Sequence, residues 1–347
     1  MSKVSVANDP RDRGGAGTPL LDVRGLVKHF GGKGGLFGRS GSVVRAVDGI
    51  DFSVAKGETL GIVGESGCGK STTARLVMQI IKPDAGDILF DGEAVGSAAL
   101  DLKAFRRQVQ MVFQDSYASL NPRLTVEDTV AFGPRIHGAS TAASIAKAHD
   151  LLHSVGLEPR RFAGRYPHEI SGGQRQRVNI ARALSLDPRL LILDEAVSAL
   201  DKSVEAQVLN LLLDLKRDFG LTYMFITHDL NVVRFMSDRI MVMYLGKVVE
   251  VGPSEPIFEK PGHPYTAALL SSMPSVDPDN LTEEAPLTGD PPNPINPPSG
   301  CRFHPRCRMA STLCSHAEPE LAEASPQHLA ACHLVGPQSG HPRLAAA

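Results

Sequence analysis

Short apolar runs alternate with longer amphipathic stretches over most of the chain, and the two patterns predict different elements. Apolar runs of roughly four to eight residues favour strands, whereas apolar positions three and four apart favour helices. The longest amphipathic helix is expected between Asp201, its N-cap, and Gly220, which stops it. Because strands alternate with helices, we expect a parallel sheet covered by helices. The predicted strands are residues 20–30, 43–47, 50–54, 59–63, 190–193, 222–227, 239–245 and 247–251, and the other predicted helices are 72–81, 126–136, 143–155 and 174–184.

Changes in composition divide the chain into segments. Six of the twelve residues from Gly31 to Ser42 are glycine, which indicates a loop inserted between two strands. Residues 274–299 hold eight prolines, a composition typical of a stiff, extended linker. We predict a flexible N-terminal arm (1–18), an α/β domain (19–255) with an inserted helical subdomain at about 115–186, a C-terminal extension with a Pro-rich linker (256–300), a cysteine cluster region (301–335) and a flexible tail (336–347).

Composition narrows the class of protein. The 347 residues include 36 Lys+Arg against 38 Asp+Glu, a near-balance that argues against holding nucleic acid through a broad basic surface. Hydrophobic residues make up 42% of the chain, which is enough to bury a core. No run reaches the ~18 apolar residues of a spanning helix, and Met1 to Pro19 has no apolar signal region. We therefore expect a soluble chain that stays in the cytoplasm.

A phosphate-binding loop is the most specific motif. The run Gly64–Ser71 fits G-x-x-x-x-G-K-[ST] and lies between a predicted strand and a predicted helix, which is the context the motif requires. Glycines let backbone N–H groups surround an anion, Lys70 reaches the β- and γ-phosphates, and Ser71 can ligate Mg²⁺. The alternative is a glycine-rich turn with an incidental lysine. Cys68 could be a redox switch near a helix N-terminus, but a small residue whose backbone binds phosphate explains it better. The predicted nucleotide-binding residues are Gly64, Glu65, Ser66, Gly67, Cys68, Gly69, Lys70, Ser71 and Thr72.

A second acidic motif follows a buried strand. The run Leu190–Leu193 ends in Asp194 and Glu195. An aspartate at the tip of such a strand can hold Mg²⁺ through water, and the neighbouring glutamate can polarise an attacking water molecule. An ordinary acidic strand end is the alternative, and the upstream phosphate loop weighs against it.

The stretch Ser171-Gly172-Gly173-Gln174 decides the subclass. Read alone, it is a loop that leads into a helix, with amides able to bind an anion. Together with Gln114, His228 and Ser198-Ala199-Leu200-Asp201, it makes the sequence resemble the ATP-binding subunits of ABC transporters over roughly residues 20–335. The resemblance implies an α/β fold: a P-loop NTPase ABC nucleotide-binding domain with an inserted helical subdomain and a small Cys-containing C-terminal tail domain.

This resemblance also implies roles for individual residues. Glu195 would be the general base, His228 would contact the γ-phosphate, and Gln114 would join the Mg²⁺ and water shell and couple it to membrane subunits. Phe30 lies where the family places an adenine-stacking aromatic, although a core-packing phenylalanine is the alternative. The Ser171–Gln174 loop would close over ATP held by a partner's phosphate loop. The implied additional ATP contacts are Phe30, Ser171, Gly172, Gly173, Gln174 and Asp201, and the implied Mg²⁺ ligands are Ser71, Gln114 and Asp194.

Further stretches resemble one branch of the family, the oligopeptide/dipeptide importers, which also includes nickel and glutathione importers. They include Tyr166-Pro167-His168-Glu169 and His263-Pro264-Tyr265-Thr266. Ser66-Gly67-Cys68-Gly69 and the Gly31–Ser42 insertion resemble the second of two paralogous ATPases. The implied partners are a paralogous ATPase in a heterodimer, two transmembrane permease subunits and a solute-binding protein, with no nucleic acid. The chain would then lie at the cytoplasmic face of the inner membrane, held there by the permeases.

Four of the five cysteines lie in the last 47 residues. In a reducing compartment such a cluster indicates a metal site before disulfides. Paired zinc ligands are typically about two to four residues apart, and no pair here is that close. Four thiolates on loops can also hold a [4Fe–4S] cluster, which the family resemblance implies. We rank the iron–sulfur cluster first, zinc second and unliganded thiols third, for Cys301, Cys307, Cys314 and Cys332.

Two rival classes remain at this stage. A soluble ABC ATPase acting on DNA or ribosomes usually has a long coiled-coil insertion or two cassettes in one chain, and this sequence has neither. A P-loop kinase or metabolic NTPase has no reason to carry Ser171-Gly172-Gly173-Gln174. Both are therefore less consistent with the sequence than a transporter ATPase.

Overall fold

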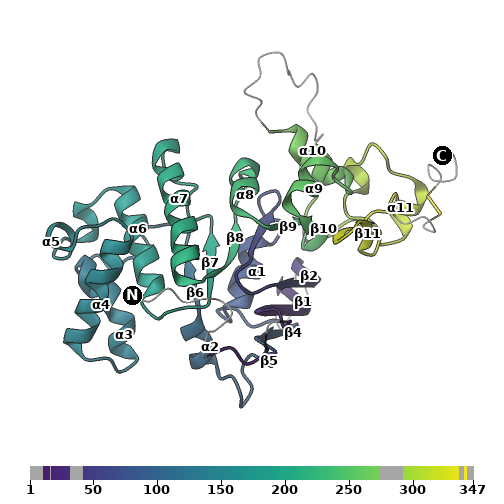
Figure 1. Cartoon of the computed structure of the whole chain (residues 1–347). Helices are drawn as coiled ribbons and strands as arrows, with labels where there is room; N and C mark the ends of the chain where they lie inside the picture. The colour runs from purple at the N-terminus through teal and green to yellow at the C-terminus, as the bar shows by residue number, and fades with distance from the viewer. Residues whose placement is uncertain (1–10, 16, 32–41, 274–291, 336–339, 342–347) are drawn as a thin grey trace, which may run out of the picture. The chain divides into compact units, whose positions relative to one another are not determined.

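The computed structural model describes residues 11–15, 17–31, 42–273, 292–335 and 340–341, shown as a cartoon in Figure 1. Two compact units divide the chain. Unit 1 comprises Met1–Asp22, Ser53–Thr59 and Ile88–Thr227, and unit 2 comprises Val23–Phe52, Leu60–Asp87 and His228–Ala347. The Gly31–Ser42 insertion, the proline-rich linker and the predicted tail lie mostly outside the described residues.

Unit 1 contains a parallel sheet and most of the helices. Strands β6 (Val109–Val112), β7 (Leu190–Asp194) and β8 (Thr222–Ile226) are neighbours in that order and run parallel, as the strand–helix alternation predicts. Every residue of β7 and β8 is buried, which explains their continuous apolar runs. The helices are α2 (Leu102–Gln108), α3 (Val126–Ile136), α4 (Thr141–Ser154), α5 (Pro159–Phe162), α6 (Gly172–Leu184) and α7 (Lys202–Phe219), with a 3₁₀ turn at Pro167–Glu169 and the short strand β5 (Glu93–Ala94).

The helices α3, α4 and α6 pack together in unit 1 (Figure 1). Thr125 and Ser140 cap α3 and α4 with side-chain oxygens that accept from backbone N–H groups. α7 ends as predicted at Gly220, which takes a left-handed conformation with φ 62°. The sequence pattern therefore gave the bounds of these helices to within about two residues, the usual spread of a helix end.

Unit 2 contains strand β3 (Thr59–Val63), whose first residue belongs to unit 1, and a mixed sheet built around it. β9 (Arg239–Tyr244) runs parallel to β3 and antiparallel to β10 (Lys247–Pro253), which pairs in turn with β12 (His328–Ala330). The other elements are β1 (Leu21–Gly31), β2 (Val43–Val54), β4 (Ala85–Phe90), β11 (Ala322–Ser325), α1 (Lys70–Val77), α8 (Leu230–Met236), α9 (Ser254–Glu259), α10 (Pro264–Ser271), α11 (Thr312–His316) and a 3₁₀ turn at His304–Arg306, with β1, β2 and β4 contributing residues to both units.

The helix predicted over residues 72–81 begins earlier and ends earlier than expected. It starts at Lys70, directly after Gly69, whose φ of 113° only glycine adopts readily. It ends at Val77, because Gln79 has a φ of 55° and cannot continue a right-handed helix.

A buried charge cluster lies at the β4–β5 hairpin of unit 1. Asp91 and Gly92 form its two-residue turn with φ 53° and 85°, the Asp-Gly geometry of a type I′ turn. The Asp91 carboxylate accepts from Arg189 Nη1 at 2.7 Å and from the backbone N–H of Arg13 at 2.8 Å, and it pairs with Lys56 Nζ at 2.8 Å. Burial alone would raise the pKa of Asp91, but these donors outweigh it and hold the pKa well below its usual range.

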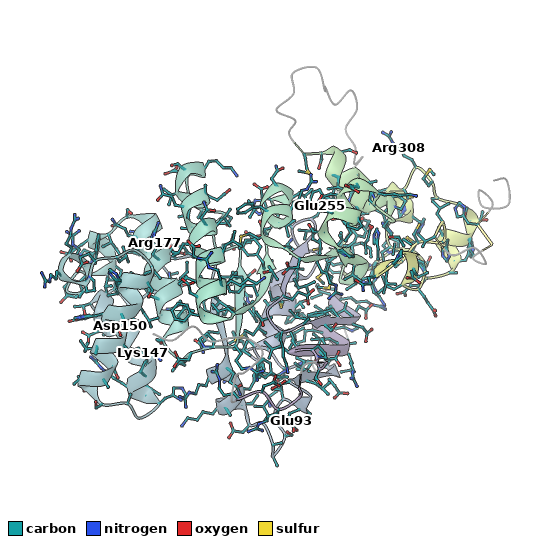
Figure 2. All side chains as sticks on the ribbon, viewed as in Figure 1. Glu93, Lys147, Asp150, Arg177, Glu255 and Arg308 are labelled. Carbon is teal, nitrogen blue, oxygen red and sulfur yellow. The ribbon has the colours of Figure 1, made fainter. Side chains whose placement is uncertain are left out.

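This depressed pKa gives unit 1 a pH dependence. A carboxyl group whose folded pKa is below its unfolded value of about 4 stabilises the fold above that pH, and the contribution is lost as the pH falls further. We expect the urea midpoint of the wild-type chain to fall as the pH is lowered from about 5 to about 3. The variant Asp91→Asn should show a flatter dependence. The exposed Asp150 on α4, labelled in Figure 2, provides the control Asp150→Asn, which should follow the wild type.

Candidate functional site

The predicted phosphate loop connects β3 to α1 in unit 2, as its motif requires. Gly64 has a φ of 147°, and a Cβ there would lie 2.2 Å from the carbonyl oxygen of Met243. At Gly69 a Cβ would lie 2.4 Å from the carbonyl oxygen of Ala46. Both glycines are therefore required by close backbone contacts as well as by conformation.

Lys70 lies inside this loop. Its Nζ donates to the carbonyl oxygens of Gly64 at 2.7 Å and Glu65 at 3.0 Å, and it reaches Cys68 Sγ at 3.8 Å. Cys68 is buried, and burial raises the pKa of its thiol despite the nearby Lys70 ammonium. A thiol with a raised pKa is a poor nucleophile, which favours the interpretation of Cys68 as a small residue of the loop.

The carboxylates of Asp194, the last residue of β7, and of Glu195, the next residue, occupy different environments in unit 1. Asp194 is buried at the end of the strand, whereas Glu195 is partly exposed and has a φ of 49°. The amide Nε2 of Gln114 donates to Glu195 Oε2 at 2.7 Å. The structure therefore brings together two of the three residues that we predict to be catalytic, and it holds the glutamate in a conformation that non-glycine residues rarely adopt.

The Ser171–Gln174 stretch begins helix α6. Gln174 N–H donates to the Ser171 hydroxyl at 3.3 Å, and Ser171 N–H donates to Gln174 Oε1 at 3.0 Å, which together form a capping box. A Cβ at Gly173 would lie 2.4 Å from Val204 Cγ1. The exposed Ser171 thus lies at the N-terminus of a 13-residue helix, where the helix dipole favours an anion.

The remaining predicted residues fall in both units. Phe30 is 39% exposed, with Lys28 Nζ 5.6 Å from its ring centroid, so its ring is available for stacking rather than packed in the core. His228 in unit 2 is exposed, and Asp201 in unit 1 is the N-cap residue of α7 without a side-chain capping bond. Unit 2 contains the phosphate loop, Phe30 and His228, and unit 1 contains the other residues predicted for ATP binding and hydrolysis.

Two residues that the sequence did not indicate contact the phosphate loop. The Tyr265 hydroxyl accepts from the backbone N–H of Glu65 at 2.8 Å, and Arg306 forms a paired contact with the Glu65 carboxylate. Both are at least 200 positions from Glu65, and no spacing rule connects segments so far apart in a sequence.

The metal cluster predicted for Cys301, Cys307, Cys314 and Cys332 is wrong, for iron–sulfur and for zinc. Within the described part of the chain, which includes all four thiols, no three or more His, Cys, Asp or Glu side chains are grouped so as to hold a metal ion. The thiols line a cavity of only about 20 Å³, room for about one water molecule and much less than a four-iron cluster needs.

The environment of the thiols is that of side chains packed in a small core. Burial raises the pKa of Cys301 to about 12 and that of Cys332 to about 11, as expected of thiols that are enclosed by apolar side chains. Cys301 and Cys307 pack against the apolar cluster that contains Tyr244 and Phe303. The spacing in the sequence could not show that these side chains fill a small core.

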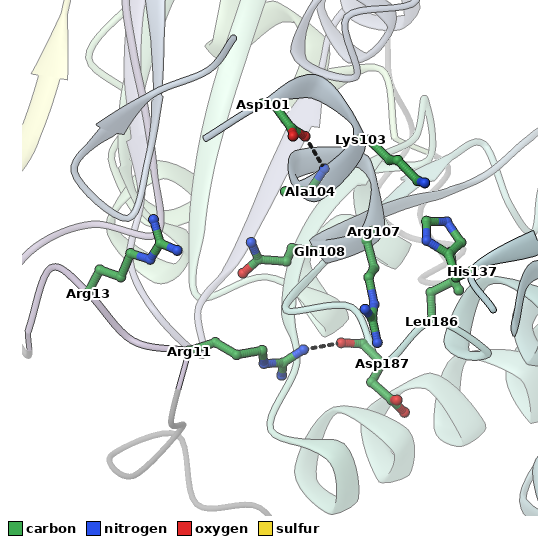
Figure 3. A pocket seen from close by; sticks show the side chains of 10 residues that line it. All are labelled: Arg11, Arg13, Asp101, Lys103, Ala104, Arg107, Gln108, His137, Leu186 and Asp187. Carbon is green, nitrogen blue, oxygen red and sulfur yellow. Dashed lines mark hydrogen bonds between the residues drawn. The ribbon is translucent and has the colours of Figure 1, made fainter. Parts of the chain in front are cut away.

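Another cavity, of about 810 Å³, lies in unit 1 and contains none of the predicted ATP-binding residues (Figure 3). Arg11 Nη1 donates to the carbonyl oxygen of Asp187 at 2.5 Å, and Arg13 Nη1 donates to that of Ala99 at 2.9 Å. Both guanidinium groups therefore already bind backbone carbonyl oxygens. We interpret the cavity as the space between the described part of the N-terminal arm and the rest of unit 1, and not as a ligand site.

The helices of the described residues include none that is both long and apolar enough to cross a membrane.

Three features of the site together define an ATPase of the ABC class. They are the phosphate loop between β3 and α1, the carboxylates of Asp194 and Glu195 at the end of the buried β7, and the capped S-G-G-Q helix.

Comparisons with known proteins give the family. The ABC transporter family matches residues 47–198, and the oligopeptide/dipeptide transporter C-terminal region matches residues 249–314. The chain is 50% identical over 320 residues to the oligopeptide transport ATP-binding protein AppF of Bacillus subtilis, covering 91% of this chain and 97% of that protein. It is 48% identical over 317 residues to a Brucella ovis protein described as a peptide import ATP-binding protein, covering 91% and 98%.

A solved structure agrees with the family. That of cbiO1 from Clostridium perfringens, part of the ABC transporter complex cbiONQ, matches with a TM-score of 0.60 at 28% identity, covering 70% of this chain and 91% of that one. The chain belongs to the ATP-binding proteins of ABC transporters, in their oligopeptide/dipeptide family. It is an ATPase coupled to transport, with ATP as its nucleotide and Mg²⁺ as the accompanying ion.

Proposed function

We propose that the chain is the energy-coupling subunit of a membrane importer for oligopeptides or dipeptides. ATP binding closes a dimer of two ATPase chains, hydrolysis reopens it, and the motion drives the permeases. The match of residues 249–314 to the oligopeptide/dipeptide C-terminal region and the names of the relatives support this substrate class.

The hydrogen bond between Gln114 and Glu195 is the observation that carries the proposal. Glu195 is the general base that accepts a proton from the attacking water. Gln114 Nε2 donates to the carboxylate of that base at 2.7 Å. Because Gln114 lies on a segment outside α6 and β7, a movement of that segment would shift the position of the Glu195 carboxylate. By the family resemblance, His228 would contact the γ-phosphate and Lys70 the β- and γ-phosphates. Ser71, Gln114 and Asp194 would hold Mg²⁺.

The Ser171–Gln174 loop completes the ATP site of a second chain. Its capping box fixes the helix N-terminus while leaving Ser171 exposed, which suits an anion presented from outside the subunit. The partner is a paralogous ATPase, and the complete importer adds two permeases and a solute-binding protein at the cytoplasmic face of the inner membrane. The helices of residues 115–186 form the inserted subdomain, and residues 301–335 form the small Cys-containing tail domain.

Co-purification tests this assembly. A tagged chain isolated from detergent-solubilised membranes should bring down a non-identical ABC ATPase and two polytopic membrane proteins, identified by mass spectrometry. The untagged chain serves as the control for nonspecific capture. Recovery with ribosomes or DNA, and without membrane proteins, would contradict the proposal and favour a soluble ABC ATPase.

A further inference from the structure

The C-terminal segment reaches the phosphate loop of its own unit through a buried arginine. Arg306 Nη1 donates to Glu65 Oε2 at 2.7 Å, and Nη2 donates to Glu65 Oε1 at 3.1 Å. This two-bond contact is the arrangement in which an arginine binds a carboxylate most specifically. The Arg306 side chain is only 6% exposed, so solvent screens the pair weakly.

The main chain of Glu65 is held as well. Its N–H donates to the Tyr265 hydroxyl at 2.8 Å, and Arg306 Nη1 also reaches the Tyr244 hydroxyl at 3.4 Å. The rings of Tyr244 and Tyr265 lie 4.6 Å apart, and each lies 5.4 Å from the ring of Phe303. Residues of α10 and of the cysteine segment therefore fix both the backbone and the side chain of Glu65.

The other side of the loop is held through the β9–β10 turn. Leu245 and Gly246 form this two-residue turn with φ 44° and 79°, and Gly246 N–H donates to the carbonyl oxygen of Cys68 at 2.8 Å. Arg302 donates to the Leu245 carbonyl oxygen and to the Asp48 carboxylate. Arg302 and Arg306 thus support the loop near Cys68 and at Glu65.

We propose that Arg306 is a positioning residue of the ATP site, which acts through Glu65 on the shape and charge of the phosphate loop. Backbone N–H groups bind phosphate well only when the loop already has the curved shape that points them inward. The Glu65 carboxylate is a negative charge within a loop that must accept a polyanion, and the Arg306 guanidinium offsets it. The C-terminal segment therefore contributes to ATP affinity, an inference that rests on the chain being an ATPase.

The test measures the Kd for MgATP on the full-length chain by titration with a fluorescent ATP analogue. We expect Arg306→Ala to raise the Kd by about 10- to 100-fold, the range that loss of a charge-assisted pair produces. In the assembled importer, KM for ATP should rise while kcat at saturating ATP changes little. Arg308→Ala is the matched control, because Arg308 is exposed two residues further along the same segment (Figure 2). A Kd for Arg306→Ala within twofold of the Arg308→Ala value would overturn the proposal.

Two further variants separate positioning from folding. Arg306→Lys keeps the charge but cannot make both bonds, so its Kd should rise several-fold. If Arg306→Lys binds MgATP with the wild-type Kd, the proposal is overturned. This outcome can be read even if Arg306→Ala does not fold. In a Glu65→Ala background, Arg306→Ala should change the Kd by less than twofold, because the carboxylate that pairs with Arg306 is gone. An undiminished effect in that background also overturns it.

A separate binding measurement distinguishes a wrong ATPase assignment from a wrong role for Arg306. The variant Lys70→Ala should lose MgATP binding. If the wild type and Lys70→Ala bind MgATP equally, the assigned ATP site is wrong, whatever Arg306 does.

Discussion

Glu195→Gln is expected to lower the ATP hydrolysis rate by on the order of 10²- to 10⁴-fold while leaving MgATP binding close to the wild-type value. In the proposed mechanism the Glu195 carboxylate accepts the proton of the attacking water, which an amide cannot do. In the wild type, Gln114 Nε2 donates to Glu195 Oε2 at 2.7 Å. The side-chain oxygen of the glutamine can still accept this hydrogen bond, so the local geometry is retained. Steady-state phosphate release and equilibrium ATP binding, measured on the same preparation, separate the two effects.

Glu93→Gln on β5 provides the matched control for this variant. It makes the same carboxylate-to-amide change in the same unit, at a residue of β5, which contains none of the predicted ATP-site residues. Glu93 is labelled in Figure 2. We expect wild-type hydrolysis from it. Unchanged hydrolysis by Glu195→Gln in the assembled heterodimer would show that another group is the base.

Glu250→Ala is expected to destabilise unit 2 by about 3–5 kcal/mol, the cost of breaking a buried pair. Glu250 on β10 is fully buried, and its carboxylate lies 2.5 Å from His328 Nε2 on β12. It also accepts from the backbone N–H groups of Gly262 at 2.6 Å and His263 at 3.0 Å. The substitution leaves all three groups without their acceptor, two of them on the buried residues His263 and His328. The urea unfolding curve of the full-length chain measures the loss.

The exposed Glu255 offers a matched comparison in the same unit. It pairs with Arg234 at 2.7 Å on the surface (Figure 2), where water screens the attraction. Glu255→Ala should leave the urea midpoint unchanged. Equal shifts for Glu250→Ala and Glu255→Ala would show that the buried carboxylate does not hold the C-terminal strands.

Local sequence signals predicted the elements around the ATP site. The glycines and lysine of the phosphate loop, the buried run of β7 and the cap of α6 each depend on residues within a few positions of one another. Their elements lie where the pattern placed them. The Asp91-Gly92 turn carried an equally local signal, an Asp-Gly pair directly after the apolar run Ile88–Phe90, but we did not predict a turn there.

Contacts between segments far apart in the sequence could not be predicted from such local signals. Arg302 and Arg306 stand beside cysteines in the sequence, and nothing within a few positions of them indicates which residues they bind. In the structure the Arg302 side chain is 8% exposed and that of Arg306 is 6% exposed, and they bind Asp48 and Glu65. The cysteine prediction failed for the same reason, since spacing along the chain says nothing about burial or about how much space lies between side chains.

ATP-driven peptide uptake tests the central claim most directly. The complete importer, with its solute-binding protein, is reconstituted into proteoliposomes, and accumulation of a radiolabelled oligopeptide is followed with and without MgATP. The account predicts uptake that requires MgATP with the wild-type chain and no uptake above background with Glu195→Gln. Uptake that is independent of ATP, or equal for the two chains, would contradict it.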